Sequence, residues 1–158
     1  MLEVKVATPD DWEAVRSVRL AALRDAPRAF WARFEDEVEF PERRWRERIS
    51  TGHNLLALLD GRPIGQATGV MPDGRSARVS LVGMWVAGEA RGIGVGARLV
   101  EGVCEWAAAS GAHRVELWVE EGNDPALRLY ERCGFRPTGE RQPMPGGDRT
   151  ELAMFRTV

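Results

Sequence analysis

Cysteine is scarce in this sequence, because Cys104 and Cys133 are the only two among 158 residues. They form neither a Cys-x-x-Cys pair nor a cluster with histidine, so we expect no disulfide scaffold, no zinc site and no other metal. Lysine is scarcer still, since Lys5 is the only one. We interpret the preference for arginine as a bias of genomic composition, not as a sign of function.

Long apolar runs are also lacking, and none approaches the roughly 18 residues that a membrane-spanning helix needs. The first residues, MLEVKVATPDD, are mixed in charge and do not have the pattern of a signal peptide. The formal net charge of −2 provides no overall attraction to nucleic acid or anionic lipid. We therefore expect a cytoplasmic protein that binds neither nucleic acid nor a membrane.

Apolar residues make up 44% of the chain, which suits a folded domain with a real core. Alternation, caps and turn residues predict the element order βααα-βββ-αβ-αββ, which is a mixed α/β (α+β) fold in one domain, residues 1–158. The expected strands are Leu2–Ala7, Leu55–Leu59, Pro63–Met71, Ala77–Ala87, Val115–Val119, Phe135–Arg141 and Leu152–Thr157.

Helices are predicted between these strands. The first begins near Pro9 and ends near Asp25, and Ala29–Ser50 is expected to hold two short helices that break near Pro41. Two more are expected to end near Ser110 and near Cys133. Turns are predicted at Asp60-Gly61 and at Pro72-Asp73-Gly74.

The stretch EARGIGVGARLV, residues 89–100, places three glycines at alternate positions between a strand and a helix. This arrangement is typical of an anion site, because helix N–H groups and the positive end of the helix dipole face the turn. A ligand-free glycine turn is the alternative. The sequence has no Gly-Lys pair for a P-loop. A dinucleotide fingerprint ending at Ala97 is allowed by spacing, but nearly ninety residues precede it, which disfavours that topology.

Two motifs carry a resemblance to a known family. Met84-Trp85-Val86 followed by Arg91–Gly96 is similar to motif A of the GNAT superfamily of acetyltransferases, although Gly88 stands where the family usually has proline. Asn123–Phe135, NDPALRLYERCGF, resembles a second motif of that family at the expected spacing. The resemblance implies a GNAT-like fold: a mixed, mostly antiparallel twisted sheet of six to seven strands, flanked by about four helices.

The resemblance further implies acetyl-CoA as co-substrate, with its pyrophosphate at the turn and its pantetheine arm along the preceding strand. Tyr130 matches the general acid that protonates the leaving thiolate, and a backbone N–H near Val86 matches the oxyanion donor. Each of these roles has a purely structural alternative. Tyr130 could be a packing residue, Asn123 could cap a helix instead of binding the cofactor, and Arg91 could close the turn instead of binding the phosphates. The implied cofactor-binding residues are Met84, Trp85, Val86, Arg91, Gly92, Ile93, Gly94, Val95, Gly96, Asn123 and Tyr130.

The general base is not identified by the motifs, because residues 77–85 contain no carboxylate. Glu116 and Glu120 share one face of the next strand, and Glu35 lies in the segment that lines the acceptor pocket in this family. Exposed surface charge is the alternative for all three. Cys133 is interpreted as a packing residue, because no His/Asp partner is evident.

The acceptor implied by the family is an amine, and we expect the primary amine of a small molecule. Aromatic and acidic residues in the segment after the first helix suit such a cation, and the expected pocket residues are Phe30, Trp31, Phe34, Glu35 and Glu37. A protein or peptide N-acetyltransferase and a non-catalytic CoA-binding module are the alternatives. A homodimer could form through a free sheet edge near Leu152–Thr157.

Overall fold

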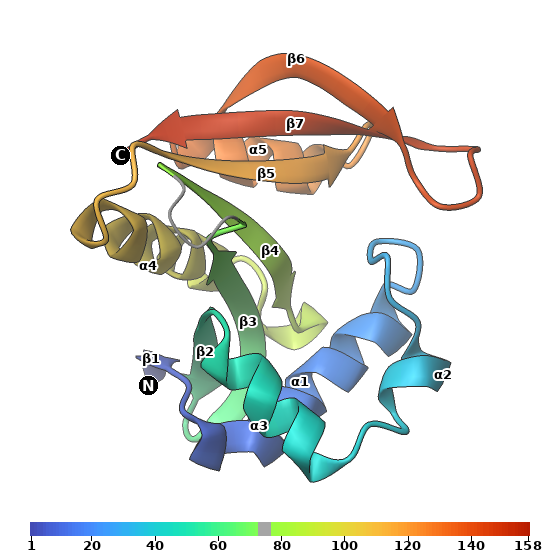
Figure 1. Cartoon of the computed structure of the whole chain (residues 1–158), viewed down its shortest axis with the longest axis vertical. Coiled ribbons are helices and arrows are strands. Elements are labelled where there is room, and N and C mark those ends of the chain that lie inside the picture. The colour runs from blue at the N-terminus through green and yellow to red at the C-terminus, as the bar shows by residue number, and fades with distance from the viewer. Residues whose placement is uncertain (73–76) are drawn as a thin grey trace.

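A seven-stranded sheet organises the computed structural model, which describes residues 1–72 and 77–158 (Figure 1). The strand order is β1-β2-β3-β4-β5-β7-β6, and among the described strands only β4 and β5 pair in parallel. The strands are β1 (Leu2–Val6), β2 (His53–Leu59), β3 (Arg62–Val70), β4 (Arg78–Val86), β5 (Arg114–Glu120), β6 (Arg136–Pro143) and β7 (Thr150–Thr157). The predicted mixed, mostly antiparallel sheet is confirmed.

The described residues form five α-helices, the number in the predicted element order and one more than the roughly four that the family resemblance implies. They are α1 (Trp12–Asp25), α2 (Phe34–Glu37), α3 (Glu42–Ser50), α4 (Val95–Ala109) and α5 (Asp124–Arg132). The predicted break near Pro41 separates α2 from α3. A short 3₁₀ turn, Pro9–Asp11, leads into α1, and the Asp11 carboxylate accepts the Thr8 N–H at 2.8 Å. The predicted element order is therefore confirmed.

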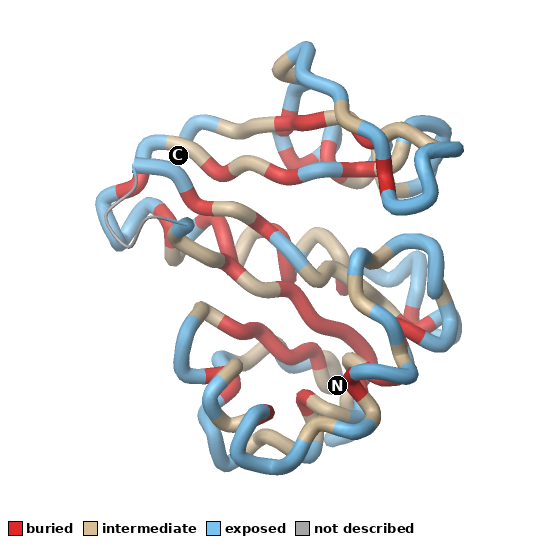
Figure 2. The backbone as a smooth tube through the Cα atoms, turned by 45° about the vertical axis from the view of Figure 1, so that its right-hand side comes forward, coloured by how far each residue is buried: buried red, intermediate tan, exposed pale blue. Residues whose placement is uncertain are grey.

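The helices cover both faces of the sheet and create two cores. The larger core contains Leu99 and Val103 of α4 together with Val79 and Val115 of the central strands. On the opposite face, Val15 and Val18 of α1 pack with Ile49 of α3 and Leu56 of β2. Burial is therefore concentrated along the central strands, as the red parts of the tube in Figure 2 show.

The sheet opens between β4 and β5. These strands pair only over Arg78–Ser80 and Arg114–Glu116, and beyond that point β4 continues along β3 while β5 continues along β7 (Figure 1). On β4, Gly83 and Met84 together oppose Ala67 of β3, which is a β-bulge, and Gly83 has a φ of 65°. A wedge with exposed backbone edges therefore lies in the middle of the sheet.

The prediction of a free sheet edge at Leu152–Thr157 is wrong. These residues belong to β7, which pairs with β5 on one side and β6 on the other, so the described sheet ends at β1 and β6. Asp73 and Gly74 of the predicted turn at 72–74 lie outside the described residues. Across the described ranges, no helix combines the length and apolarity that a membrane span requires.

Candidate active site

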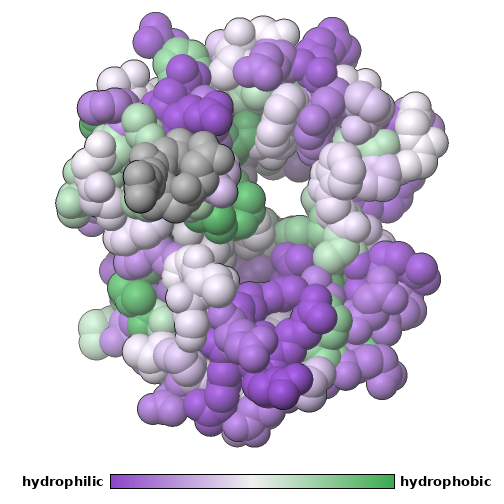
Figure 3. Space-filling view, viewed as in Figure 1, coloured by the Kyte–Doolittle hydropathy of each residue, from purple (hydrophilic) through white to green (hydrophobic). Residues whose placement is uncertain are grey.

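A cavity of about 1380 Å³ occupies the wedge and continues to the segment after α1. Figure 3 shows the opening between the half of the molecule that carries β5–β7 and the half that carries α1–α3. At one rim, Arg28 binds Asp148 at 3.1 Å, and Arg149 Nη2 donates to the Arg28 carbonyl at 2.7 Å. These contacts tie the β6–β7 loop to the segment after α1, so the cavity is bridged on that side.

The glycine turn forms one end of the cavity. Gly94 caps α4 in the left-handed region with a φ of 88°, and a Cβ there would meet no atom within 4 Å. The Arg98 N–H donates to the Gly94 carbonyl at 3.1 Å, so the N–H groups ahead of Arg98 have no acceptor inside the helix. The turn therefore presents unpaired donors and the positive end of a 15-residue helix to the cavity.

Arg91 closes this turn against β4 and α1. Its Nε donates to the Val86 carbonyl at 2.9 Å, and its Nη2 donates to Asp25 Oδ2 at 3.0 Å. The Trp85 indole donates to the same carboxylate oxygen at 3.0 Å. This indole hydrogen bond, together with that of Arg91, lowers the pKa of Asp25. These contacts show that Arg91 closes the turn, which is one of the two roles expected for it from the sequence.

The backbone of Val86 faces the wedge. The Ala87 N–H donates to the Ile64 carbonyl of β3 at 2.8 Å, so the preceding pair, Val86 and Gly65, is a non-hydrogen-bonded pair of the antiparallel ladder. The N–H and C=O of Val86 therefore point away from β3. The contact from Arg91 to the Val86 carbonyl agrees with this direction.

Tyr130 of α5 also lines the cavity, with its ring tilted against Phe135 at a centroid distance of 6.0 Å. Burial raises the pKa of Tyr130 to about 12, so its hydroxyl keeps its proton at neutral pH. Within the described ranges, that hydroxyl makes no hydrogen bond to the protein. It is therefore available to a molecule in the cavity.

The two cysteines do not join this site. Both are buried, and neither lines the cavity. Burial raises the pKa of Cys104 to about 11 and also raises that of Cys133, which disfavours the nucleophilic thiolate.

Two further cofactor-binding candidates differ in position. Asn123 lines the cavity, while its side chain caps α5 by accepting the Ala126 N–H at 3.4 Å. Ile93 is exposed and lies outside the cavity wall.

Acidic residues line the β5–β7 wall. Glu116 lies 3.0 Å from Arg114 and 3.5 Å from Arg78, and Glu120 lies 2.8 Å from Arg149. Glu151 faces Glu120 across the β5–β7 ladder and is only 5% exposed. The Glu151 carboxylate accepts a hydrogen bond from the side-chain amide of Gln142, which is neutral. Of these three carboxylates, Glu151 is therefore the one without an arginine partner among the described residues.

The segment after α1 contributes fewer residues to the cavity wall than expected. Phe30 and Trp31 line the cavity, but Phe34, Glu35 and Glu37 do not, and this corrects the expected acceptor pocket. Phe34 packs under Arg24, and Glu35 is an exposed residue paired with Arg33. Glu37 is buried because it binds Arg19 and Arg48. Of the three base candidates from the sequence, Glu116 and Glu120 therefore line the cavity, whereas Glu35 lies outside it.

Sequence reasoning missed Arg19, Arg48 and Glu151, all of which line the cavity. Arg19 lies on the face of α1 that carries Val15, one turn earlier, which is a weak signal that it points toward the sheet. The position of Glu151 depends on the pairing of β5 with β7, for which the sequence holds no local signal.

Known proteins resemble this chain across the same elements. The sequence model of the acetyltransferase (GNAT) family matches residues 20–135. A mycothiol acetyltransferase from Clavibacter michiganensis is 34% identical over 128 residues, which are 80% of this chain and 39% of that protein. The chain spans between 22% and 54% of the length of the curated relatives that it matches.

Solved structures agree with this match. An acetyltransferase of the GNAT family from Streptococcus pneumoniae superposes with a TM-score of 0.83 at 20% identity, covering 100% of this chain and 99% of that one. A ribosomal-protein-alanine N-acetyltransferase from Brucella melitensis gives a TM-score of 0.75 at 25% identity, covering 99% of both chains.

Proposed function

The chain belongs to the acetyltransferase (GNAT) family, and from this premise we propose that it transfers an acetyl group from acetyl-CoA directly to a primary amine of a small molecule. Residues 1–158 act as one domain in this proposal. The observation that carries it is the wedge between β4 and β5, which leads from the glycine turn to Tyr130. This arrangement combines an anion site, a free strand edge and a proton donor in one cavity.

The chain's own groups fit acetyl-CoA. Gly92–Gly96 of the turn offer unpaired N–H donors and a helix N-terminus to the pyrophosphate, and no side chain fills the space around Gly92 and Gly94. The wedge edge of β4 at Met84 and Val86 would hold the pantetheine arm by backbone contacts, with Asn123 on the opposite side. When bound, acetyl-CoA supplies the activated acetyl group.

Two groups would assist the transfer. The Val86 N–H, which points into the wedge, would polarise the thioester carbonyl. The Tyr130 hydroxyl would give its proton to the departing thiolate, whose pKa is near the value of about 8.5 for a cysteine thiol. Because Cys133 is buried and outside the cavity wall, transfer without an acyl-enzyme is the route that these residues favour.

The acceptor amine would lie at the acidic wall. Glu120 and Glu151 together carry more negative charge than Arg149 neutralises, so this wall favours an ammonium ion. A base, or a path for the proton to water, is required, because an alkylamine has a pKa of about 10.4. We propose Glu151 for this role, with Glu116 and Glu120 as the candidates that remain from the sequence.

A small molecule is the favoured acceptor because contacts between Arg28, Asp148 and Arg149 bridge one rim of the cavity. A peptide N-terminus is the second candidate. The 25% identity to a protein named as a ribosomal-protein-alanine N-acetyltransferase supports it. The cavity and this likeness therefore lead to different acceptors, which a direct assay separates.

The assay measures free thiol released from acetyl-CoA in the presence of amines, amino acids, antibiotics and peptides. Turnover with a small amine, and little with peptides, is the result we expect. Turnover with peptides alone would favour the second candidate. Tight CoA binding without thiol release from any acceptor would contradict catalysis and indicate a CoA-binding module.

The cofactor part of the proposal predicts a specific effect at Gly94. Gly94→Ala should weaken CoA binding by about 10- to 100-fold, because a shifted turn loses one or more charge-assisted hydrogen bonds of about 1.5–3 kcal/mol each. Gly111→Ala is a matched control, since Gly111 also has a positive φ, 86°, and open space around it but lies outside the cavity. Calorimetric titration with CoA should separate the two variants; an equal loss in both would contradict a cofactor role for the turn.

A further inference from the structure

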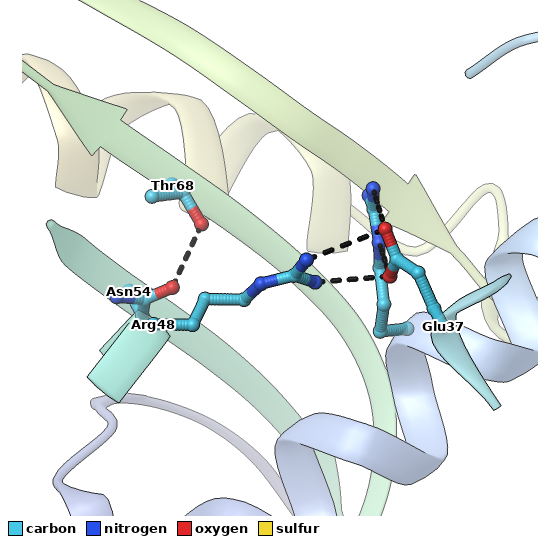
Figure 4. A network of polar contacts seen from close by, with 5 residues as sticks. Glu37, Arg48, Asn54 and Thr68 are labelled. Carbon is cyan, nitrogen blue, oxygen red and sulfur yellow. Dashed lines mark hydrogen bonds and ion pairs between the residues drawn. The ribbon is translucent and has the colours of Figure 1, made fainter. Parts of the chain in front are cut away.

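Two arginines on the helical wall of the cavity are held by one buried carboxylate. Arg19 of α1 donates from Nε and Nη2 to Glu37 at 2.9 and 3.2 Å, and Arg48 of α3 donates from Nη1 and Nη2 to the same carboxylate at 3.0 and 3.3 Å. Figure 4 shows Arg48 extended toward Glu37 along the sheet, beyond the Asn54–Thr68 contact. Each guanidinium is therefore fixed in position.

The group as a whole is positive. It has two guanidiniums and one carboxylate, and Glu37 is 3% exposed and is not part of the cavity wall, whereas both arginines are. A guanidinium has more N–H donors than the two that each arginine gives to Glu37. No other acceptor for Arg19 or Arg48 occurs among residues 1–72 and 77–158. A molecule in the cavity therefore meets fixed positive charge with free donors.

Aromatic rings support this orientation. The Arg19 guanidinium lies 5.2 Å from the centre of the Phe30 ring, and that of Arg48 lies 5.0 Å from the Trp45 ring. Arg19 Nη1 also lies 3.8 Å from the position that a Cβ on Gly83 would occupy, so it reaches the bulge of β4. The positive group is thus next to the strand on which the acetyl group is proposed to lie.

The cavity is polarised as a result. Glu120 and Glu151 lie on the β5–β7 wall, where Arg149 pairs with Glu120 at 2.8 Å. Arg19 and Arg48 lie on the wall formed by α1 and α3. An acceptor with one positive and one negative group would match both walls, whereas a simple alkylamine would leave the arginines unmatched.

We propose that the acceptor is an amine that also carries a carboxylate, and that Arg19 and Arg48 bind this carboxylate. The inference rests on the proposed acetyl transfer and names the substrate class of the same site. Gly83 and Val86 are three residues apart on β4, which is at most roughly 10 Å at a rise of about 3.3 Å per residue, because the bulge at Gly83 shortens the strand. The amine should therefore be separated from the carboxylate by several bonds, as in an ω-amino acid.

The test uses ω-amino acids of increasing chain length, each paired with the alkylamine that lacks the carboxylate. We expect kcat/KM to favour the amino acid by about 10- to 100-fold at the longer chain lengths, because the alkylamine cannot make the charge-assisted hydrogen bonds to the two guanidiniums. Arg48→Gln should remove most of this preference by raising KM with little change in kcat. Arg48→Lys should restore part of it, since lysine keeps the charge but not the planar fork.

The matched control is Arg43→Gln on the same helix, because its side chain is 85% exposed and lies outside the cavity. It should keep the full preference. Equal kcat/KM for amino acids and their alkylamines, or an unchanged preference in Arg48→Gln, would overturn the inference while leaving the acetyl transfer intact. A stronger preference for aminoalkylphosphonates would overturn the assignment to a carboxylate.

A binding measurement separates this inference from the proposed activity. Propionate, which has no amine, should bind the wild-type protein saturably in an NMR titration, with shifts centred on Arg19 and Arg48, and Arg48→Gln should weaken that binding at least about tenfold. Propionate binding without acetylation of any amine would contradict the proposed activity and support the carboxylate site. Absence of saturable binding would overturn the carboxylate site.

Discussion

Tyr130→Phe is expected to lower kcat by about 10²- to 10⁴-fold, the usual contribution of a positioned general acid. The substitution removes only the hydroxyl, so the ring still packs against Phe135. We therefore expect the affinity for CoA and the free energy of unfolding to change little. Steady-state kinetics with a saturating acceptor, together with a CoA titration, measure both parts of this expectation.

The pKa of Tyr130 gives this prediction a pH dependence. Burial raises that pKa to about 12, so the hydroxyl stays protonated, and able to donate, throughout the neutral and mildly alkaline range. The loss in the phenylalanine variant should therefore be similar at every pH below the pKa of the tyrosine. An unchanged kcat in Tyr130→Phe would remove the hydroxyl from the chemistry and leave Tyr130 as a packing residue.

Glu37→Ala is expected to reduce the free energy of unfolding by about 3 kcal/mol, the scale found when one partner of a buried ion pair is removed. The truncation leaves Arg19 and Arg48 facing each other without their shared acceptor. Glu35→Ala is the matched control on the same helix, because its side chain is 69% exposed and lies 3.6 Å from Arg33. That control should change stability by less than about 1 kcal/mol.

Glu37 also makes the stability of the protein depend on pH. Burial alone would raise the pKa of Glu37, but hydrogen bonds and charges from Arg19 and Arg48 outweigh burial and lower it. Its contribution is therefore complete above the unfolded pKa of about 4.3 and is lost as the pH falls through the lower folded value.

Urea denaturation between neutral and acid pH tests this dependence. The stability difference between wild type and Glu37→Gln should shrink as the pH falls below about 4.3, because protonated glutamate and glutamine are then equivalent in charge. A difference that stays constant across this range would contradict the charged role of Glu37. In that case the carboxylate would contribute only through its shape and neutral hydrogen bonds.

Local patterns were sufficient to predict the glycine turn and the helix that carries Tyr130, whereas the roles of these residues toward acetyl-CoA come from the family resemblance and are proposals. The turn before α4 is continuous in sequence, and its glycines, its unpaired N–H groups and the first turn of the following helix all lie within residues 91–98. Tyr130 lies on an amphipathic helix whose cap and stop are visible in the sequence. These features needed no knowledge of long-range contacts.

The side of the cavity where the acceptor is proposed to bind could not be predicted in the same way. Glu37 lies in an acidic stretch that has the composition of a solvated helix, and only the packing of α1 against α3 buries it between two arginines. Glu151 reaches the cavity because β7 is inserted between β5 and β6. That insertion also removes the expected free edge at residues 152–157. Sheet order is a tertiary property, so local periodicity does not contain it.

The most direct test of acetyl transfer follows an isotope-labelled acetyl group from acetyl-CoA to its product. Each thiol released should be matched by one labelled amide on the acceptor amine, and protein incubated with labelled acetyl-CoA alone should keep its original mass. Thiol release without labelled amide, or label that accumulates on Cys104 or Cys133, would contradict direct transfer to an amine.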